Sequence, residues 1–290
     1  MRSSNPVFSR RGFSRDNGYA GFNAQQPQAG GPAVGTNPYA QGAGTPYATN
    51  PYAPAGTQQG APAPVRTDVM TMDDVVTRTG MTLGTVVLGA VLAWALLPVT
   101  PTSYGIAIGS ALVAFVLAIV QSFKRTPSPA LILTYAAFEG IFLGVISEMF
   151  NSRWSGAPFQ AVVGTMAVTG AMLFVYKQRW IRVTARYARI GMTIALAFIG
   201  VMAVNLLLVL FGVAEDGGLR SFGTLGAIVS ILAILIGCFF LTLNFKEIED
   251  GIAYGAPRQE SWLAAFGLTV TLVWIYLEML RLVAIFSGDD

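Results

Sequence analysis

The sequence predicts an all-α integral membrane protein. Apolar residues make up 53% of the chain and charged residues only 11%, whereas a soluble protein carries about 25% charged residues. The charges are also unevenly placed, with long intervals that contain none. Seven apolar segments lie between them, each close to the ~20 residues that a helix needs to cross ~30 Å of hydrocarbon. These observations together indicate a chain that crosses a membrane seven times.

Residues 1–65 differ in composition from the rest of the chain. They are rich in Gly, Pro, Ala, Gln and Asn, with "NPYA" at Asn37 and again at Asn50. Such a segment buries too little apolar surface to offset the entropy lost on ordering, so we expect a disordered cytoplasmic tail. Its spaced tyrosines could bind a protein partner, or the tail could be solvated with incidental repeats (Tyr39, Tyr47, Tyr52). Residues 66–290 then form the membrane domain.

The membrane domain begins with a lead-in, "DVMTMDDVVTRTG", which starts at Asp68 and reads as a short amphipathic segment. Thr71 or Asp73 is a suitable helix cap there. The connections between the later segments are short and hold Pro, Gly, Asn or charges, as in "PVTPTS" and "GVAEDGG". The seven predicted spans are Met81–Leu97, Tyr104–Phe123, Pro129–Phe150, Phe159–Tyr176, Ile190–Phe211, Thr224–Asn244 and Trp262–Phe286.

The lysines and arginines predict the orientation. With seven spans and a cytoplasmic N-terminus, 15 of the 18 cations fall in cytoplasmic pieces, and the outer loops hold only Arg153 and Arg220. Cytoplasmic loops of membrane proteins carry such an excess. We therefore expect a multi-pass plasma-membrane protein with its N-terminus inside and its C-terminus outside. A re-entrant last segment would instead return the C-terminus to the inside.

The third span carries two carboxylates, in "LTYAAFEGIFLGVISEMF" (Leu133 to Phe150). An ionisable group at mid-depth costs at least ~2.5–3.5 kcal/mol and usually serves a function. Glu139 lies at mid-depth and must face a partner or a water-filled cavity. Glu148 follows nine residues later, on the opposite face and roughly 13 Å further along the helix. It can reach interfacial water, so a solvated side chain is the simpler interpretation there.

The seventh span carries Glu278 and Arg281 in "YLEMLRL", three residues apart and on neighbouring faces of one turn. One interpretation is a local ion pair, and another is that Arg281 extends its head toward the outer interface. If Glu139 and Glu278 faced a common interior, they would form a proton-responsive pair, because burial and like-charge repulsion both disfavour the ionised forms.

An acidic stretch, "LNFKEIEDGIAYGAPRQESW", joins the sixth and seventh spans. Its carboxylates, together with that of Glu148, could form a cation-attracting vestibule (Glu247, Glu249, Asp250). An ordinary solvated connector is the alternative.

Several functions are excluded by composition. The chain has no histidine and one cysteine, Cys238. The absence of histidine excludes HExxH zinc sites, Ser-His dyads and histidine proton shuttles. No predicted span contains an aspartate, which leaves no aspartyl dyad. We therefore expect no enzymatic activity, no cofactor, no fixed metal site and no nucleic-acid partner.

Three motifs carry a resemblance to a known family: "FEGIFLG", "LNFKEIEDGIAYGAP" and "WIYLEMLRL". In their order and in the seven-segment layout, Asp68 to Phe286 resemble the Bax-inhibitor-type family, whose actinobacterial branch also carries long polar tails. The resemblance implies six helices around a central seventh and a pH-sensitive calcium leak controlled by acidic residues of the last two helices. Glu139 matches the acidic position of the family's "EG..LG" motif, and Asn244 and Glu278 match the two positions of the acidic latch.

Asparagine stands where the family carries the first aspartate of its latch. Because asparagine holds no negative charge, Asn244 and Glu278 cannot share a proton as two carboxylates do, and the pH response would depend on Glu278 alone. By the predicted boundaries Asn244 lies at the cytoplasmic end of its span and Glu278 beyond mid-depth. Contact between the two would require the sixth helix to be shifted or broken.

The leading functional hypothesis is a cation leak channel, with Ca²⁺ as the expected ion and lipid as the surroundings. Hard cations prefer oxygen ligands, and the polar groups within the spans are rich in oxygen. Protonation of Glu278 and Glu139 would control it, with Asn244 and Arg281 nearby. The alternatives are a proton-coupled secondary transporter and a membrane-embedded regulatory protein whose tail recruits partners.

Overall fold

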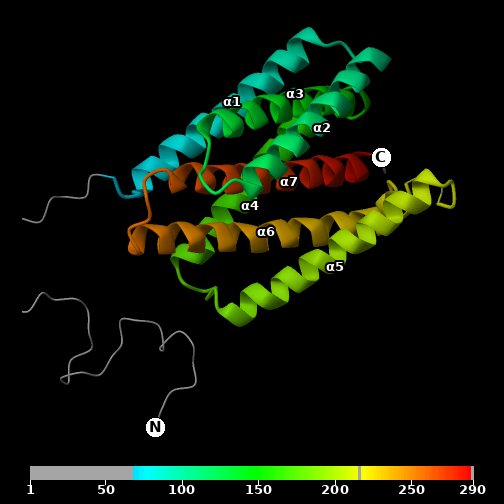
Figure 1. Cartoon of the computed structure of the whole chain (residues 1–290). Coiled ribbons are helices and arrows are strands. Elements are labelled where there is room, and N and C mark those ends of the chain that lie inside the picture. Colours follow the sequence, from blue (N-terminus) through cyan, green and yellow to red (C-terminus); the bar gives the residue numbers. More distant parts are fainter. Residues whose placement is uncertain (1–67, 215–216, 289–290) are drawn as a thin grey trace, which may run out of the picture. The chain divides into compact units, whose positions relative to one another are not determined.

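We describe the protein from a computed structural model in which residues 68–214 and 217–288 are placed (Figure 1). The predicted tail, residues 1–65, lies outside the described residues. The described part is helical, with seven long α-helices, one short 3₁₀ helix and a single antiparallel bridge between Val69 and Pro257. All seven long helices have the length and hydropathy needed to cross a membrane, which confirms the predicted fold class. Their bounds are α1 Met72–Leu96, α2 Pro101–Phe123, α3 Pro129–Arg153, α4 Ala157–Lys177, α5 Ala185–Leu210, η1 Gly218–Arg220, α6 Thr224–Ala253 and α7 Glu260–Ser287.

Two predicted boundaries were wrong. Helix α1 starts at Met72 instead of Met81, because Thr71 caps it by accepting a hydrogen bond from the backbone N–H of Asp74. The lead-in is therefore the first turns of the first span. Helix α6 continues nine residues past Asn244, so the acidic residues assigned to the connector lie on the helix itself. Gly255, with a φ of +67°, follows α6 and turns the chain toward α7.

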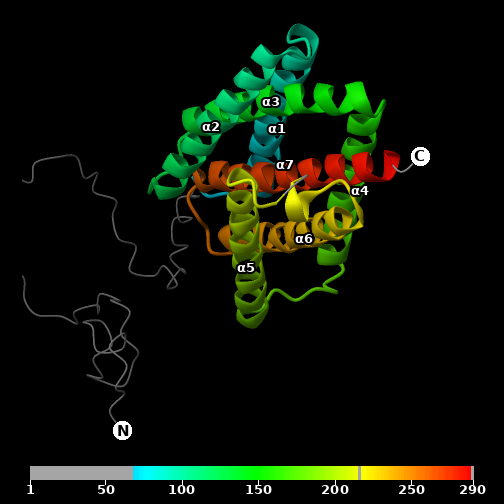
Figure 2. The same cartoon turned by 90° about the vertical axis from the view of Figure 1, so that its right-hand side faces the viewer.

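Helix α7 lies at the centre of the bundle. It packs directly against α1, α3, α4 and α6, and Figures 1 and 2 show it running between them. Helix α2 packs on α3 and reaches α7 through the cluster that contains Tyr135 and Phe266. Helix α5 reaches α7 through Phe198, whose ring centroid lies 6.5 Å from that of Trp274. Six helices thus surround the seventh, as the resemblance implies.

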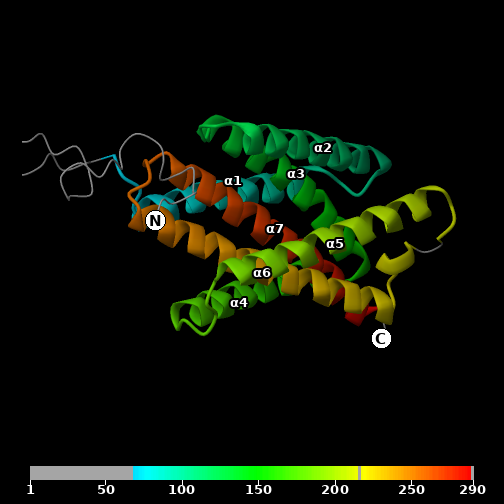
Figure 3. The ribbon, with the colours of Figure 1, turned by 60° about the horizontal axis from the view of Figure 1, so that its bottom comes forward.

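Burial distinguishes the interior helices from the outer ones. The most apolar stretches of α6 and α7 are 56% and 50% buried within the protein, against 11% in α5 and 6% in α4. An apolar helix that leaves most of its surface uncovered needs hydrocarbon around it. In helix α5 only Ala195 and Asn205 are buried. This helix lies at the lower edge of the bundle in Figure 1 and passes in front of α6 in Figure 3.

Small residues allow α1 and α3 to pack backbone against backbone. A Cβ atom added at Gly140 or Gly144 would overlap the carbonyl oxygen of Val86 or Ala90, respectively, on α1. Close approach through glycines spaced four residues apart is a common way for helices to associate in lipid, where the hydrophobic effect between helices is absent. This contact fixes the rotation of α3 and therefore the direction of Glu139.

The alternating helices give the bundle two ends. At the N-terminal end lie residues 68–71 and the α6–α7 connection. At the C-terminal end lie η1 and the last turn of α7. The polar residues of interest divide between these two ends, with Glu139 between them.

Candidate functional site

Glu278 is buried near the C-terminal end of α7, with 5% of its surface exposed. One carboxylate oxygen accepts a hydrogen bond from Nη2 of Arg220 at 2.8 Å. Arg220 is the last residue of η1, and its side chain is 38% exposed. The pair therefore joins a buried carboxylate on the central helix to a partly exposed cation on the connection between α5 and α6.

Arg281 does not form the local ion pair with Glu278 that its spacing suggested. It is 6% exposed, and its Nη2 atom donates to the backbone oxygen of Ser221 at 3.2 Å. Among the described residues, Glu278 pairs with Arg220 and no carboxylate lies within ion-pairing distance of Arg281. The correction has a geometric cause: the guanidinium of Arg281 is directed at α6 and its N-terminal approach, close to Gly226.

Three buried polar atoms without hydrogen-bond partners lie at this end of the α6–α7 interface: Glu278 Oε2, Arg281 Nη1 and Ser230 Oγ. Trp274 on α7 donates to Ala233 of α6, and this register places Ser230 level with Glu278. An orphaned buried polar group costs ~1–3 kcal/mol, so such groups usually have a partner in the intact molecule. We refer to Arg220, Ser230, Glu278 and Arg281 as the C-terminal cluster.

Glu139 is half-buried on the face of α3 that meets α7. Its neighbours one turn away on that face are Tyr135, which packs edge-on against Phe266, and Leu143, which packs with Val273. Among the described residues no side chain hydrogen-bonds to Glu139. Its contacts place it level with the middle of α7, roughly 13 Å along the axis from Glu278. Glu139 faces α7, whereas Glu278 lies on α7 itself and contacts Arg220 of η1, so the two carboxylates do not form a pair.

Asn244 lies close to the N-terminal end of the α6–α7 interface. Its amide nitrogen donates to Thr271 Oγ1 at 2.9 Å and to the backbone oxygen of Gly267 at 3.3 Å. Thr271 precedes Glu278 by seven residues, or ~10 Å along the helix. The two latch positions implied by the resemblance are therefore not in contact, and helix α6 runs unbroken between Asn244 and the C-terminal cluster.

A cavity of about 190 Å³ opens beside Asn244. Two carboxylates line it, Glu247 from α6 and Glu260 from the first turn of α7, and Met70 closes another side. We call this space the N-terminal cavity. It combines one amide and two acidic side chains with apolar walls, which is an environment that attracts a cation without enclosing it.

The other residues of the predicted vestibule have different surroundings. Glu249 accepts a hydrogen bond from the hydroxyl of Tyr176, and Asp250 pairs with Lys246 one turn earlier on α6. Glu148 is half-buried, and its Oε2 atom has no partner in the described part of the chain. Of the predicted set, only Glu247 lines the N-terminal cavity.

A much larger pocket of about 970 Å³ lies between α1, α4 and α7. Its lining is apolar apart from a few hydroxyl groups, among them those of Ser147 and Tyr276, which hydrogen-bond each other at 2.6 Å. No charged residue lines it. This pocket therefore lacks the ligands that an ion pathway needs.

Three residues of these sites were not singled out from the sequence. Arg220 looked like an ordinary loop cation, and Glu260 looked like part of a connector. Asn205 on α5 is 5% exposed and holds the start of η1, accepting from the N–H of Leu219 at 2.7 Å and donating to Gly217 O at 3.2 Å. An asparagine inside an apolar span was the available signal, because a buried amide requires partners.

The comparisons with known proteins agree with the geometry. No curated protein sequence matches the chain significantly. A family model described as Bax inhibitor 1 like matches residues 5–288, which is nearly the whole chain. This seven-helix membrane protein therefore belongs to the Bax inhibitor 1 like family.

Proposed function

We propose that this protein is a pH-sensitive cation leak pathway of the plasma membrane, with Ca²⁺ as the expected ion. The observation that carries the proposal is the ion pair between the buried Glu278 and the partly exposed Arg220. It ties the connection between α5 and α6 to the central helix, and it depends on the ionisation of one carboxylate. Such a pair can serve as a proton-controlled closure.

The direction of the pH effect follows from the charges around Glu278. Arg220 of η1 and Arg281 of α7 are the cations near it, and α6 contributes the uncharged Ser230 at the same level. While Glu278 is ionised, it holds Arg220. Protonation removes the negative charge and weakens the charge-assisted hydrogen bond, which leaves two guanidinium groups that repel each other. Acidification therefore releases η1 from α7 and opens the C-terminal end of the bundle.

Oxygen-bearing side chains on α3, α6 and α7 supply the kind of ligands that the proposed pathway needs. The N-terminal cavity supplies Asn244, Glu247 and Glu260, and Glu139 of α3 lies at about the same level of α7 as Asn244. Carbonyl and carboxylate oxygens suit a hard cation such as Ca²⁺. With the predicted orientation, the N-terminal cavity faces the cytoplasm and the C-terminal cluster faces outward, so external acid is the opening signal.

The spans give less support to a proton-coupled transporter. Such transporters bind their substrate at unwound segments of interrupted helices. In the described residues each of the seven spans is one continuous helix. A leak pathway requires no such interruption.

The proposal is tested with the full-length protein in liposomes loaded with a Ca²⁺ indicator. We expect Ca²⁺ entry to rise several-fold when the external medium is acidified from neutral pH, because protonation of Glu278 removes the charge that holds Arg220. Arg220→Gln should allow entry at both neutral and acidic pH, because the closing pair is absent. Arg153→Gln, which removes an exposed arginine of the same face, should behave as wild type. Entry that is absent at both pH values in all three proteins would refute the proposal.

A further inference from the structure

The segment just before α1 is paired with the connection between α6 and α7. The backbone N–H of Met70 donates to Ala256 O at 2.8 Å, and that of Arg258 donates to Asp68 O at 3.0 Å. Between these bonds, Val69 and Pro257 form the antiparallel bridge. We call residues 68–71 the strap. It joins two parts of the chain that are almost 190 residues apart in sequence and lies across one end of the bundle.

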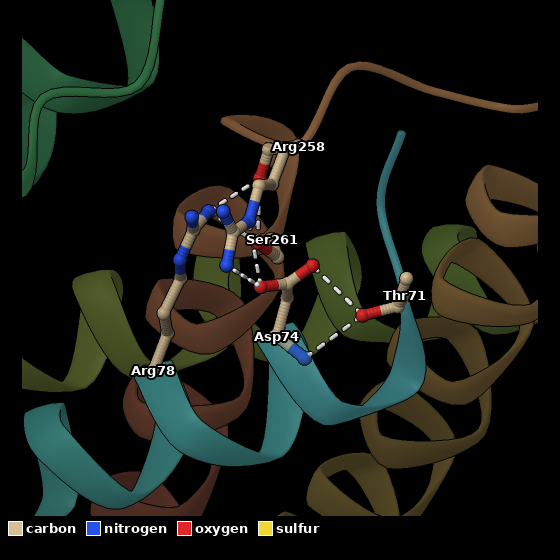
Figure 4. Close-up of polar contacts among 5 residues, drawn as sticks. All are labelled: Thr71, Asp74, Arg78, Arg258 and Ser261. Carbon is tan, nitrogen blue, oxygen red and sulfur yellow. Dashed lines mark hydrogen bonds and ion pairs between the residues drawn. The ribbon is translucent and has the colours of Figure 1, made fainter. Parts of the chain in front are cut away.

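Side chains fasten the strap on the α1 side, as Figure 4 shows. The carboxylate of Asp74 accepts from Arg258 at 2.8 Å and from the hydroxyl of Thr71, also at 2.8 Å. The guanidinium of Arg78 donates to the backbone oxygen of Arg258 and to the hydroxyl of Ser261. One acidic residue, Asp74, thus links the strap, α1 and the α6–α7 connection.

The strap places one apolar side chain inside the bundle. Met70 is 4% exposed and packs in a cluster with Leu241, Ile248 and Leu268. It also forms part of the wall of the N-terminal cavity, beside Asn244. Removal of the strap would remove this wall and widen the cavity toward the end of the bundle.

The strap is held more weakly than the helices it covers. Its own contacts are two backbone hydrogen bonds, the buried side chain of Met70 and the hydrogen bond from the hydroxyl of Thr71 to Asp74. Beside it, an ion pair joins Asp74 of α1 to Arg258, whose side chain is 54% exposed. Exposed ion pairs contribute little, and segments with few buried contacts open locally at low free-energy cost. A contact of this kind suits a part that opens and closes.

From these contacts we propose that the strap is a latch which closes the N-terminal cavity, with Met70 as the plug and the Asp74–Arg258 pair as its fastening. The idea that this cavity is one end of an ion path rests on the proposed function, whereas closure of the cavity by the strap is independent of that function.

The test measures access to the cavity and needs no ion flux. A single reporter thiol is placed at the cavity wall by Asn244→Cys in a Cys238→Ser background, in the full-length protein in nanodiscs. The rate of modification by a charged thiol reagent is compared between this protein and the same protein carrying Asp74→Asn. We expect modification about fivefold faster with Asp74→Asn, because the fastening is lost. The matched control is Asp73→Asn, whose exposed side chain has no partner within the described residues.

A second pair of variants tests the plug. Met70→Ser should speed modification more than Asp74→Asn does, whereas Met72→Ser, at a site that is 54% exposed, should leave the rate unchanged. Hydrogen exchange adds a readout that does not depend on the reporter. The amides of Met70 and Arg258 should be protected in the parent protein and with Asp73→Asn, and should exchange at least several-fold faster with Asp74→Asn.

Equal modification rates in the parent, Asp74→Asn and Met70→Ser proteins would overturn the latch, provided that all three melt at similar temperatures. Unchanged protection of the two amides in Asp74→Asn would overturn it as well. If Ca²⁺ flux is absent but access changes as described, the latch stands and the proposed function fails. If Ca²⁺ flux depends on pH but the reagent's access to the cavity does not change in any variant, the proposed function stands and the latch fails.

Discussion

Nη2 of Arg220 lies 2.8 Å from a carboxylate oxygen of Glu278, across 58 residues of sequence. Glu278 is almost fully buried on the central helix, while Arg220 belongs to a short, half-buried 3₁₀ turn. A buried carboxylate in an apolar helix bundle is tolerated when a cation and hydrogen bonds compensate it. Here the compensation comes from outside the central helix, from the connection between α5 and α6.

Removal of either partner should destabilise the fold, and the two losses should not add. Arg220→Gln leaves Glu278 buried without its cation, and we expect ~1–3 kcal/mol of lost stability at neutral pH, discounted for the partial exposure of Arg220. The double variant Arg220→Gln/Glu278→Gln should be more stable than the sum of the single losses suggests. Unfolding in detergent provides the measurement, with Arg153→Gln as the control. Strictly additive losses would contradict a direct interaction.

Asn205 should act by positioning η1. It satisfies two backbone groups of Gly217 and Leu219, just before Arg220. Asn205→Ala should cost ~1–2 kcal/mol through the lost buried hydrogen bonds and should raise Ca²⁺ entry at neutral pH, because Arg220 is then placed less firmly. The paired substitution Arg220→Gln should abolish any further effect of Asn205→Ala on entry. If Asn205→Ala still raises entry in the Arg220→Gln background, the residue does not act through the ion pair.

Asn244 and Glu278 should behave as independent sites. Thr271, the partner of Asn244, lies ~10 Å from Glu278 along α7, and the two residues share no partner in the described part of the chain. Asn244→Asp restores the carboxylate that the family pattern suggests, and it should disturb the contact with Thr271 without altering the pH response that Glu278 provides. The effects of Asn244→Asp and Glu278→Gln on stability should therefore add within ~0.5 kcal/mol. A larger interaction energy would indicate that the latch implied by the resemblance forms after all.

Gly140 should be intolerant of any side chain. A Cβ atom there would overlap the backbone of Val86, which has no flexible end to move. We expect Gly140→Ala to cost ~1–3 kcal/mol by forcing α1 and α3 apart. Gly84→Ala is the matched control on α1, because no atom lies within 4 Å of its added Cβ, and it should be neutral or slightly stabilising. Equal melting temperatures for the two variants would contradict the close helix contact.

Much of the fold was predictable from the sequence because apolar length and cation placement constrain helices in a membrane. The start of α1 and the C-terminal end of α6 were less predictable. The charged residues after Asn244 predict that the sixth helix ends there. A helix that leaves the hydrocarbon can nevertheless continue when its charged residues pair along it, as Lys246 and Asp250 do. The register of Asn244 and Glu278 followed from helix geometry, and the structure agrees that the two residues are apart.

The pairing of the charges was not predictable in the same way. Glu278 had a nearby cation in sequence, Arg281, and a distant one, Arg220. Local spacing favoured the first, whereas the fold of the α5–α6 connection around Asn205 brings the second into contact. Only the packing of α5, η1 and α7 together determines which cation reaches the carboxylate. Sequence spacing along one helix contains no information on that packing.

The most direct test of the central claim is the pH dependence of Ca²⁺ entry in Glu278→Gln. Glutamine keeps the shape of the protonated carboxyl group and cannot ionise, so the ion pair with Arg220 and its charge-assisted hydrogen bond are lost at every pH. Our account predicts entry in Glu278→Gln at neutral pH that equals the entry of the wild type at acidic pH, with little further change on acidification. A variant that stays closed at neutral pH and opens on acidification, as the wild type is expected to do, would contradict the account.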